Sequence, residues 1–385
     1  MTKRQGRHAV RTAVLALAVC LSGARCFSLA DADSLAEQWR SAGLLGLSLT
    51  GSPLAAGQAL ADWLTAAGQE TDGQTLPVQG ELSAAPEPAA AQEAQTPAPQ
   101  PSAQIPAEEA AAAQQLPDGW LTVRETTYPD TGDGERYLPL AAGSVRNLTD
   151  YSAAQVRQAL AEDGLPFTVE LDSDRPQVLI MHTHATECYA EADGMVSAQN
   201  NGRTTDTAAN MVAVGEVLAR TLNEAGICTV QDAALHDYPS YNGSYGRSCR
   251  TVEQWLEDCP SIRIVLDVHR DAIEADGVRI KPTALVEGQK AAQLMIICGA
   301  DDGTMNMPNF WQNLRFAAAL EAAVEGDYDG LTRPVLFDYR NYNQQLTTGS
   351  LLLEVGGHGN TLEEARYTAR LVGQSLAKLL RGAAG

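Results

Sequence analysis

The chain has 385 residues, and its 48 acidic and 27 basic side chains give it a formal net charge of −21 at pH 7. Nucleic-acid binding needs clustered Lys and Arg opposite the phosphates, so this balance argues against a nucleic-acid partner. The length alone would allow two domains. The composition of the first third of the chain, however, is not that of a compact core.

The extreme N-terminus has the composition of an export signal. An apolar run over residues 12–24 follows a basic cluster made of Lys3, Arg4, Arg7 and Arg11. This pattern is typical of a secretory signal or a short membrane anchor, although a full membrane span needs about 20 apolar residues. We therefore expect residues 1–30 to be a signal or membrane anchor and the rest of the chain to be exported. Cleavage and retention of the segment both stay open.

Three further segments precede the main domain. Residues 31–80 carry leucines and tryptophans between polar positions, a pattern that favours amphipathic helices near the membrane or a partner. Residues 81–115 are nearly all Ala, Pro, Glu and Gln without an aromatic side chain. They bury too little apolar surface to offset their ordering entropy, which predicts a disordered spacer. Residues 116–175, with a helix-like pattern over 151–164, are expected to be a lead-in extension packed on the domain that follows.

From residue 176 to the C-terminus, residue 385, strand-like and helix-like segments alternate. The strand-like runs cover residues 178–181, 227–230, 262–268, 291–299 and 351–357, and the helical patterns cover residues 206–226, 250–259, 307–326 and a stretch after Asn360. Asp206 is the expected N-cap of the first helix, and Thr361 with Glu364 forms a capping box for the last. The alternation predicts an α/β fold with a mixed, largely parallel sheet and helices on both faces.

Three of the strand-like runs end in polar residues that suggest one site. The first run leads to His182, His184 and Glu187, the 262–268 run to His269 and Arg270, and the last run contains Glu354. In open α/β sheets the carboxyl ends of strands form the rim where ligands and catalytic groups gather. We therefore expect these residues, distant in the chain, to lie together.

The inventory of histidines and carboxylates favours zinc hydrolysis. Catalytic zinc usually takes three His or carboxylate ligands and lowers the pKa of bound water to about 7. An unligated Glu can then carry the proton. Glu354 follows three leucines, so its desolvation needs a partner, which a metal site would supply. The seven cysteines contain no CxxC pair, which argues against a cysteine zinc site.

Several motifs resemble those of stage II sporulation protein P, over about residues 140–385. They are HTHATECY (182–189), HDYPSYNGSYGRS (236–248), DVHRDA (267–272), YNQQL (342–346) and LLLEVGGHGN (351–360). The resemblance implies a membrane-anchored wall hydrolase of endospore-forming bacteria, similar in fold and chemistry to zinc N-acetylmuramoyl-L-alanine amidases. It implies cleavage of the amide between N-acetylmuramic acid and L-alanine, and also of peptide cross-links.

The resemblance also implies a setting and partners. Such a protein acts on septal peptidoglycan at the septal or forespore membrane during engulfment, attached to the membrane through its N-terminus. Its implied partners are a lytic transglycosylase of the stage II sporulation protein D type and a membrane protein that serves as scaffold.

The resemblance assigns roles to individual residues. It implies that His184 and His269 are metal ligands and that Glu354 is the catalytic carboxylate. For the third ligand, Asp206 stands nearest to the place where the amidases supply a Glu, and Glu187 is its rival.

The remaining motif residues are expected to contact substrate. Arg270 is a candidate catalytic residue that could hold a stem-peptide carboxylate or the oxyanion. The candidate substrate-binding residues are His182, Glu187, Arg340, Tyr342, Asn343 and Gln344. Two alternatives to the amidase stay open: a secreted zinc carboxypeptidase or deacetylase with the same ligand types, and a non-catalytic scaffold that binds the wall.

Overall fold

A computed structural model describes residues 117–132 and 134–383 of the chain. The predictions for residues 1–30, 31–80 and 81–115 lie outside the described residues. Within the described part, no helix combines the length and the apolar character needed to cross a membrane.

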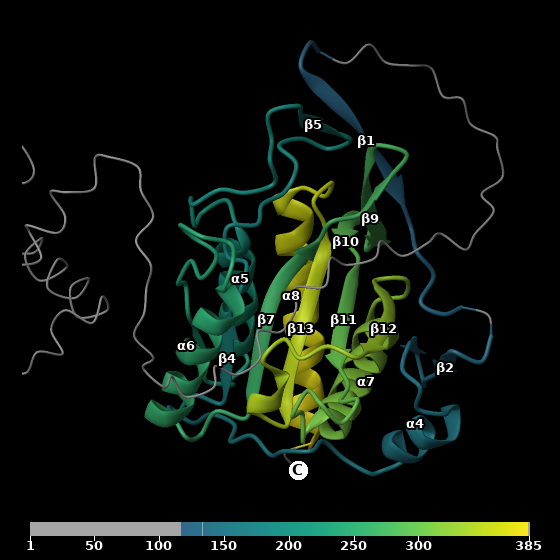
Figure 1. Ribbon diagram of the computed structural model, residues 1–385, viewed down its shortest axis with the longest axis vertical. Coiled ribbons are helices and arrows are strands. Elements are labelled where there is room, and N and C mark those ends of the chain that lie inside the picture. The colour runs from purple at the N-terminus through teal and green to yellow at the C-terminus, as the bar shows by residue number, and fades with distance from the viewer. Residues whose placement is uncertain (1–116, 133, 384–385) are drawn as a thin grey trace, which may run out of the picture. The chain divides into compact units, whose positions relative to one another are not determined.

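The centre of the fold is an eight-stranded sheet (Figure 1). From one edge to the other its strands are β2 (Tyr137–Pro139), β3 (Ser144–Asn147), β12 (Thr332–Asp338), β11 (Leu294–Gly299), β13 (Gly349–Gly357), β7 (Ile264–Asp271), β4 (Val178–Met181) and β6 (Thr229–Gln231). Only the pairs β2–β3 and β11–β13 are antiparallel. The predicted mixed, largely parallel sheet is confirmed.

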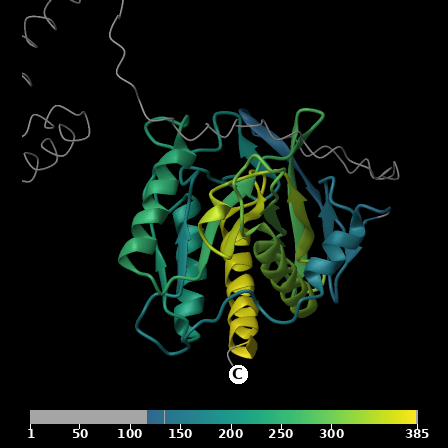
Figure 2. The ribbon, with the colours of Figure 1, turned by 60° about the horizontal axis from the view of Figure 1, so that its bottom comes forward.

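Helices cover both faces of this sheet (Figures 1 and 2). The helices are α4 (Ala153–Leu160), α5 (Met211–Glu224), α6 (Ser244–Asp258), α7 (Phe310–Asp327) and α8 (Leu362–Ala383), with a short 3-10 helix, η1 (Gln344–Leu346). Alternate residues of β4 point to opposite faces. Val178 and Ile180 join the core formed with α5, α7 and α8, whereas Leu179 and Met181 pack with α6.

The helix starts differ most from the predictions at two places. The first predicted helix begins at Met211, with Asn210 rather than Asp206 as N-cap: the Asn210 side chain accepts a hydrogen bond from the amide of Val212. Helix α6 begins at Ser244, six residues before the helical pattern predicted from residue 250. The capping box of α8 is confirmed, since Thr361 and Glu364 each accept a hydrogen bond from the other's amide.

A smaller sheet stands beside the main one (Figure 1). It runs in the order β10 (Gln289–Ala292), β9 (Val278–Val286), β1 (Trp120–Thr126) and β5 (Met195–Ser197), with β8 (Glu274–Ala275) paired to β9. The predicted strand over residues 291–299 is therefore two strands, β10 and β11, which belong to different sheets. The chain passes between them at the buried Gln293, whose amide side chain bonds both backbone groups of Tyr128 and the carbonyl of Gly330.

A buried lysine fastens the small sheet to the rest of the domain. Lys281 on β9 has no exposed area and contacts the carboxylates of Asp193 and Glu364, with that of Glu125 at 3.6 Å. A buried charge costs several kcal/mol unless it is paired. The cluster therefore holds β1, the segment after β4 and α8 together.

Candidate metal centre

Three neighbouring strands bring His184, His269 and Glu354 together near the carboxyl ends of the parallel strands of the main sheet. His184 follows the end of β4, His269 lies near the end of β7, and Glu354 lies on β13 directly beside His269 in the register of the parallel pair. In-register partners project their side chains to the same face. That face is the one packed by α6, because Val265 and Leu266, on opposite faces of β7, belong to the α6 cluster and the main core respectively.

His184, Glu187 and His269 form a buried cluster that could hold a metal ion. One ligand atom from each lies within 4.8 Å of the others. The carboxylate of Glu187 stands between the two rings, with Oε1 3.7 Å from Nδ1 of His184 and Oε2 3.7 Å from Nδ1 of His269. No hydrogen bond joins the carboxylate to either ring, and Nε2 of His184 is buried without a hydrogen-bond partner. Two histidine rings and a carboxylate that lie close together without bonding one another fit a divalent cation held between them.

Asp206 does not join this cluster, which corrects the expectation of Asp206 as third ligand. Its side chain is exposed and accepts a hydrogen bond from the amide of Ala208, two residues on. The helix expected to begin at Asp206 begins five residues later, so its carboxylate caps a turn instead of facing the site. Glu187, the alternative third ligand and a predicted substrate-binding residue, lies where a ligand would be needed.

The two histidines differ in ionisation in the metal-free protein. Burial, reinforced by the nearby His269, lowers the pKa of His184 to about 4. Burial opposes the charging of His269 as well, but Asp267 outweighs it and raises the pKa of His269 to about 9. A metal at this centre would have to displace the proton of His269.

The two carboxyl groups nearest the cluster differ as well. Burial raises the pKa of Glu187, but Arg270 and the two histidines outweigh it, so this pKa is lowered and the group stays ionised. Burial and the charge of Asp271 raise the pKa of Glu354 to about 8. Its Oε2 atom has no hydrogen-bond partner. Glu354 therefore has the pKa of a group that takes up and releases a proton near neutral pH.

The side chain of Arg270, the predicted catalytic arginine, is buried and bonds other groups of the protein. Its side chain is 7% exposed and donates hydrogen bonds to the carbonyls of Cys188 and Gly202. Nη1 lies 3.8 Å from Oε1 of Glu187, and the Arg270 amide donates to Oε2 of the same carboxylate at 3.3 Å. Gly202 has a φ of +73°, and a Cβ there would lie 2.9 Å from Arg270 Nη2. Arg270 thus positions Glu187 and the segment that follows it.

His182, predicted to bind substrate, is also bonded within the core. It is fully buried, its Nδ1 lies 2.9 Å from the carbonyl of Val268, and Gln231 donates to its Nε2 at 3.0 Å. Burial lowers its pKa to about 4, so the ring is neutral. These bonds leave no ring nitrogen for a ligand, and they join β4, β6 and β7 behind the site.

Aromatic rings pack around His184. Tyr241, which is 42% exposed, stacks on His184 with 4.7 Å between ring centroids, and Arg203 lies over the Tyr241 ring at 4.7 Å. Tyr245 contacts His184 edge-on and stacks on Tyr342 at 5.2 Å. These rings shield the histidines from water, which strengthens electrostatic interactions at the centre.

The four residues predicted between β12 and β13 divide into two pairs. Arg340 donates to Asp338 and to the hydroxyl of Tyr342, and both side chains are partly exposed. Asn343 donates to the carbonyl of Tyr245 and to the hydroxyl of Ser248. Gln344 is buried and bonds β11 at Gly299 and Ile297. The first pair can still reach a substrate, whereas the second pair holds this segment in place.

Sequence reasoning assigned no role to two residues that complete the centre. Asp267, two residues before His269, has Oδ1 2.7 Å from Nε2 of His269 and accepts two hydrogen bonds from Thr183. Arg203 pairs with Asp237 at 2.6 Å and lies 3.7 Å from Glu187. The alternation along the 262–268 strand could have identified Asp267, because residues two apart share a face. No local signal identifies Arg203.

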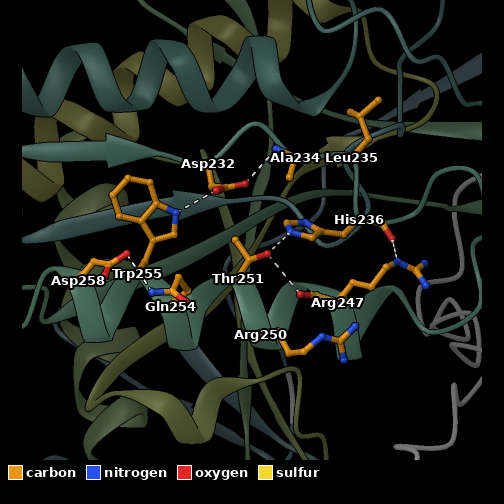
Figure 3. A pocket seen from close by; sticks show the side chains of 10 residues that line it. All are labelled: Asp232, Ala234, Leu235, His236, Arg247, Arg250, Thr251, Gln254, Trp255 and Asp258. Carbon is orange, nitrogen blue, oxygen red and sulfur yellow. Dashed lines mark hydrogen bonds between the residues drawn. The ribbon is translucent and has the colours of Figure 1, made fainter. Parts of the chain in front are cut away.

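A cavity of ≈ 560 Å³ lies along α6 and the segment after β6 (Figure 3). Its polar side chains largely bond one another: Trp255 donates to Asp232, and His236 Nε2 pairs with Thr251. His236 Nδ1 lies 2.8 Å from the carbonyl of His182. The residues that line this cavity therefore support the backbone that leads from β4 to the cluster of His184, Glu187 and His269.

The motifs at this centre correspond to a known family. The family model described as stage II sporulation protein P matches residues 77–377. The chain belongs to the stage II sporulation protein P family. The protein of that name from Bacillus subtilis (strain 168) is 28% identical over 239 residues, which are 58% of this chain and 55% of the relative. The chain thus spans about half the length of the curated relative it matches, and the predicted family membership is confirmed.

Solved structures similar to the described domain include two amidases. N-acetylmuramoyl-L-alanine amidase AmiC2 of Nostoc punctiforme is 13% identical, with a TM-score of 0.33 over 54% of this chain and 96% of that one. The CwlD amidase of Clostridioides difficile, solved in complex with the GerS lipoprotein, is 10% identical, with a TM-score of 0.33 over 54% of this chain and 99% of that one.

Proposed function

We propose that this member of the stage II sporulation protein P family is a zinc-dependent peptidoglycan hydrolase. Its proposed reaction is cleavage of the amide between N-acetylmuramic acid and L-alanine, with peptide cross-links as further substrates. The observation that supports it is the buried His184–Glu187–His269 cluster with Glu354 beside it on the next strand. Two histidines, a carboxylate ligand and a free glutamate are the set that zinc hydrolases use.

The donor set fits zinc, and the chemistry can be assigned to the residues around it. Zinc bound by His184, Glu187 and His269 would supply a Lewis acid and lower the pKa of a water to about 7. Glu354 would accept a proton from the water that attacks the amide carbonyl. It would then give that proton to the nitrogen as the C–N bond breaks, so that the L-alanine amine is released and the lactyl group of muramic acid is left as a carboxylic acid. A cation nearby favours the ionised form of Glu354, which prepares it to act first as the base.

The neighbouring residues would prepare the centre for this reaction. Arg270 holds the Glu187 carboxylate through its amide and guanidinium group. Tyr241 and Tyr245 pack on His184 and limit the access of bulk water. Arg340 and Tyr342 are partly exposed polar groups near Glu354, and they are the proposed contacts to the substrate.

The cellular setting is part of the same proposal. Export and attachment through residues 1–30 would direct the domain to septal peptidoglycan during engulfment. A lytic transglycosylase of the stage II sporulation protein D type would cut the glycan strands, and a membrane scaffold would hold the two enzymes together.

Product analysis tests the proposed reaction. The full chain, loaded with zinc, is incubated with purified peptidoglycan, and the soluble products are identified by mass spectrometry. We expect stem peptides with a free N-terminal L-alanine, and no release after treatment with a chelator. Products shortened only at the peptide C-terminus would favour a carboxypeptidase, and loss of acetyl groups a deacetylase. Binding to sacculi without soluble products would favour a wall-binding scaffold.

A further inference from the structure

Asp267 links the candidate ligand His269 to a chain of hydrogen bonds that crosses the centre. Its side chain is buried, and Oδ1 lies 2.7 Å from Nε2 of His269. The two atoms are within hydrogen-bond distance but are not aligned as a hydrogen bond. Hydrogen bonds at catalytic sites are often poorly aligned before the site is loaded and tighten in the loaded complex.

Thr183 donates hydrogen bonds to both oxygens of the Asp267 carboxylate. The Thr183 amide donates to Oδ1 at 2.8 Å, and the Thr183 hydroxyl donates to Oδ2 at 2.7 Å. The Thr183 hydroxyl also lies 2.8 Å from that of Ser248 on α6, to which Asn343 donates at 3.1 Å. Hydrogen bonds therefore link Ser248 and Asn343, through Thr183, to this carboxylate.

The number of available hydrogen atoms determines which group donates and which accepts in this series of hydrogen bonds. Each hydroxyl has a single hydrogen, and an ionised carboxylate only accepts. Thr183 therefore directs its hydrogen to Asp267, and Ser248 directs its own to Thr183 instead of to the Tyr245 carbonyl 3.1 Å away. All donors point toward Asp267, which leaves its Oδ1 atom as an acceptor for His269.

A hydrogen-bond acceptor beside Nε2 of His269 determines which ring nitrogen keeps a lone pair for a metal. A neutral imidazole carries one N–H, and the group bonded to one nitrogen determines the state of the other. With the proton on Nε2 facing Asp267, the lone pair is on Nδ1, the atom 3.7 Å from Glu187 Oε2. We propose that Asp267 is a positioning residue: it holds His269 as the Nε2–H tautomer and so makes Nδ1 the metal-binding atom. This inference rests on the proposed zinc function.

Zinc affinity of the full-length protein tests this role without any need for activity. Affinity is measured by competition with a chromophoric chelator in the wild type and in Asp267→Ala. We expect a loss of about 10- to 100-fold, the usual effect of removing a carboxylate behind a ligating histidine. The absorption spectrum of the cobalt-loaded variant should change as well, because the His269 ring is no longer held in one orientation.

Matched variants separate this role from packing. Thr183→Val removes the hydroxyl that donates to Asp267 and should weaken zinc binding, and Thr183→Ser should restore it. Glu321→Gln is the control, since Glu321 is also a buried carboxyl group that accepts a hydrogen bond from a threonine, Thr332, but lies on α7 away from the centre. It should bind zinc like the wild type.

The outcomes distinguish this inference from the proposed function. Wild-type zinc affinity in Asp267→Ala overturns the positioning role and leaves the hydrolase proposal standing. If Asp267→Ala does not fold, equal affinities of Thr183→Val and Thr183→Ser overturn it instead. A wild-type protein that binds no zinc overturns the proposed function and this inference together.

Discussion

Glu187 and Asp206 differ in what their removal should do to zinc binding. Glu187 stands between the two histidines in the buried cluster, whereas the carboxylate of Asp206 caps an exposed turn. Glu187→Ala should therefore abolish stoichiometric zinc binding, as should His184→Ala, because a three-ligand site loses one ligand. Asp206→Ala should keep it. Metal analysis after dialysis decides between them, and zinc retained in Glu187→Ala but lost in Asp206→Ala would restore Asp206 as the ligand.

Glu354 is predicted to move protons without binding the metal. Glu354→Gln should keep one zinc per chain and reduce peptidoglycan hydrolysis by about 100- to 10,000-fold, the usual contribution of a general acid–base group. The amide has nearly the shape of the neutral carboxyl group, so the fold should persist. Zinc content and rate of product release are measured on the same sample. Loss of zinc would make Glu354 a ligand, and a near wild-type rate would remove it from the mechanism.

At the scale of elements, β1 supports the segment that carries Glu187. β1 pairs with β5 and β9, and Val123 on β1 packs with Ala190 and Val196 in that segment. Removal of residues 1–116 should leave both folding and zinc binding intact. Removal of residues 1–126 takes β1 away and leaves the Lys281 cluster without Glu125. We expect a melting temperature several degrees lower, at about 2–4 °C per kcal/mol for a domain near this size, and weaker zinc binding.

Thermal melts with and without zinc check the role of β1. If the two shortened proteins have the same melting temperature and the same zinc affinity, β1 is dispensable, and the segment after β4 holds Glu187 without it.

For the whole molecule, the buried histidines predict how stability depends on pH. The pKa of His269 is raised to about 9 in the metal-free protein, so its contribution to stability is complete below its unfolded pKa of about 6.5 and is lost as the pH rises through 9. The pKa values of His182 and His184 are lowered to about 4, so folding favours their neutral forms. Their contribution is complete above about 6.5 and is lost as the pH falls through 4.

The opposite signs of these three histidines place their largest joint contribution to the stability of the metal-free protein near pH 6.5. Zinc requires unprotonated ligands, so loading with zinc should move the optimum to higher pH. Melting temperatures from pH 5 to 9, with and without zinc, measure the shift. A metal-free melting temperature that keeps rising up to pH 9 would contradict the raised pKa of His269.

The local sequence determined which residues are candidates for the chemistry. The apolar runs that lead to His184 and His269, and the run that contains Glu354, are visible without any tertiary information, because a buried strand needs a nearly continuous apolar stretch. The same locality explains why the α/β class and the capping box at Thr361 could be predicted. The composition of residues 81–115 likewise predicts a spacer from the sequence alone.

Only the tertiary structure decided which carboxylates stand beside those histidines. The position of Glu187 depends on Arg270, and the surroundings of His269 depend on Asp267 and Thr183. The split of one apolar run at Gln293 depends on which sheet each half joins. These arrangements come from contacts between residues far apart in the chain, and hydrophobic periodicity contains no information about such pairs. The choice of Glu187 over Asp206 as the third candidate ligand therefore depends on the folded chain.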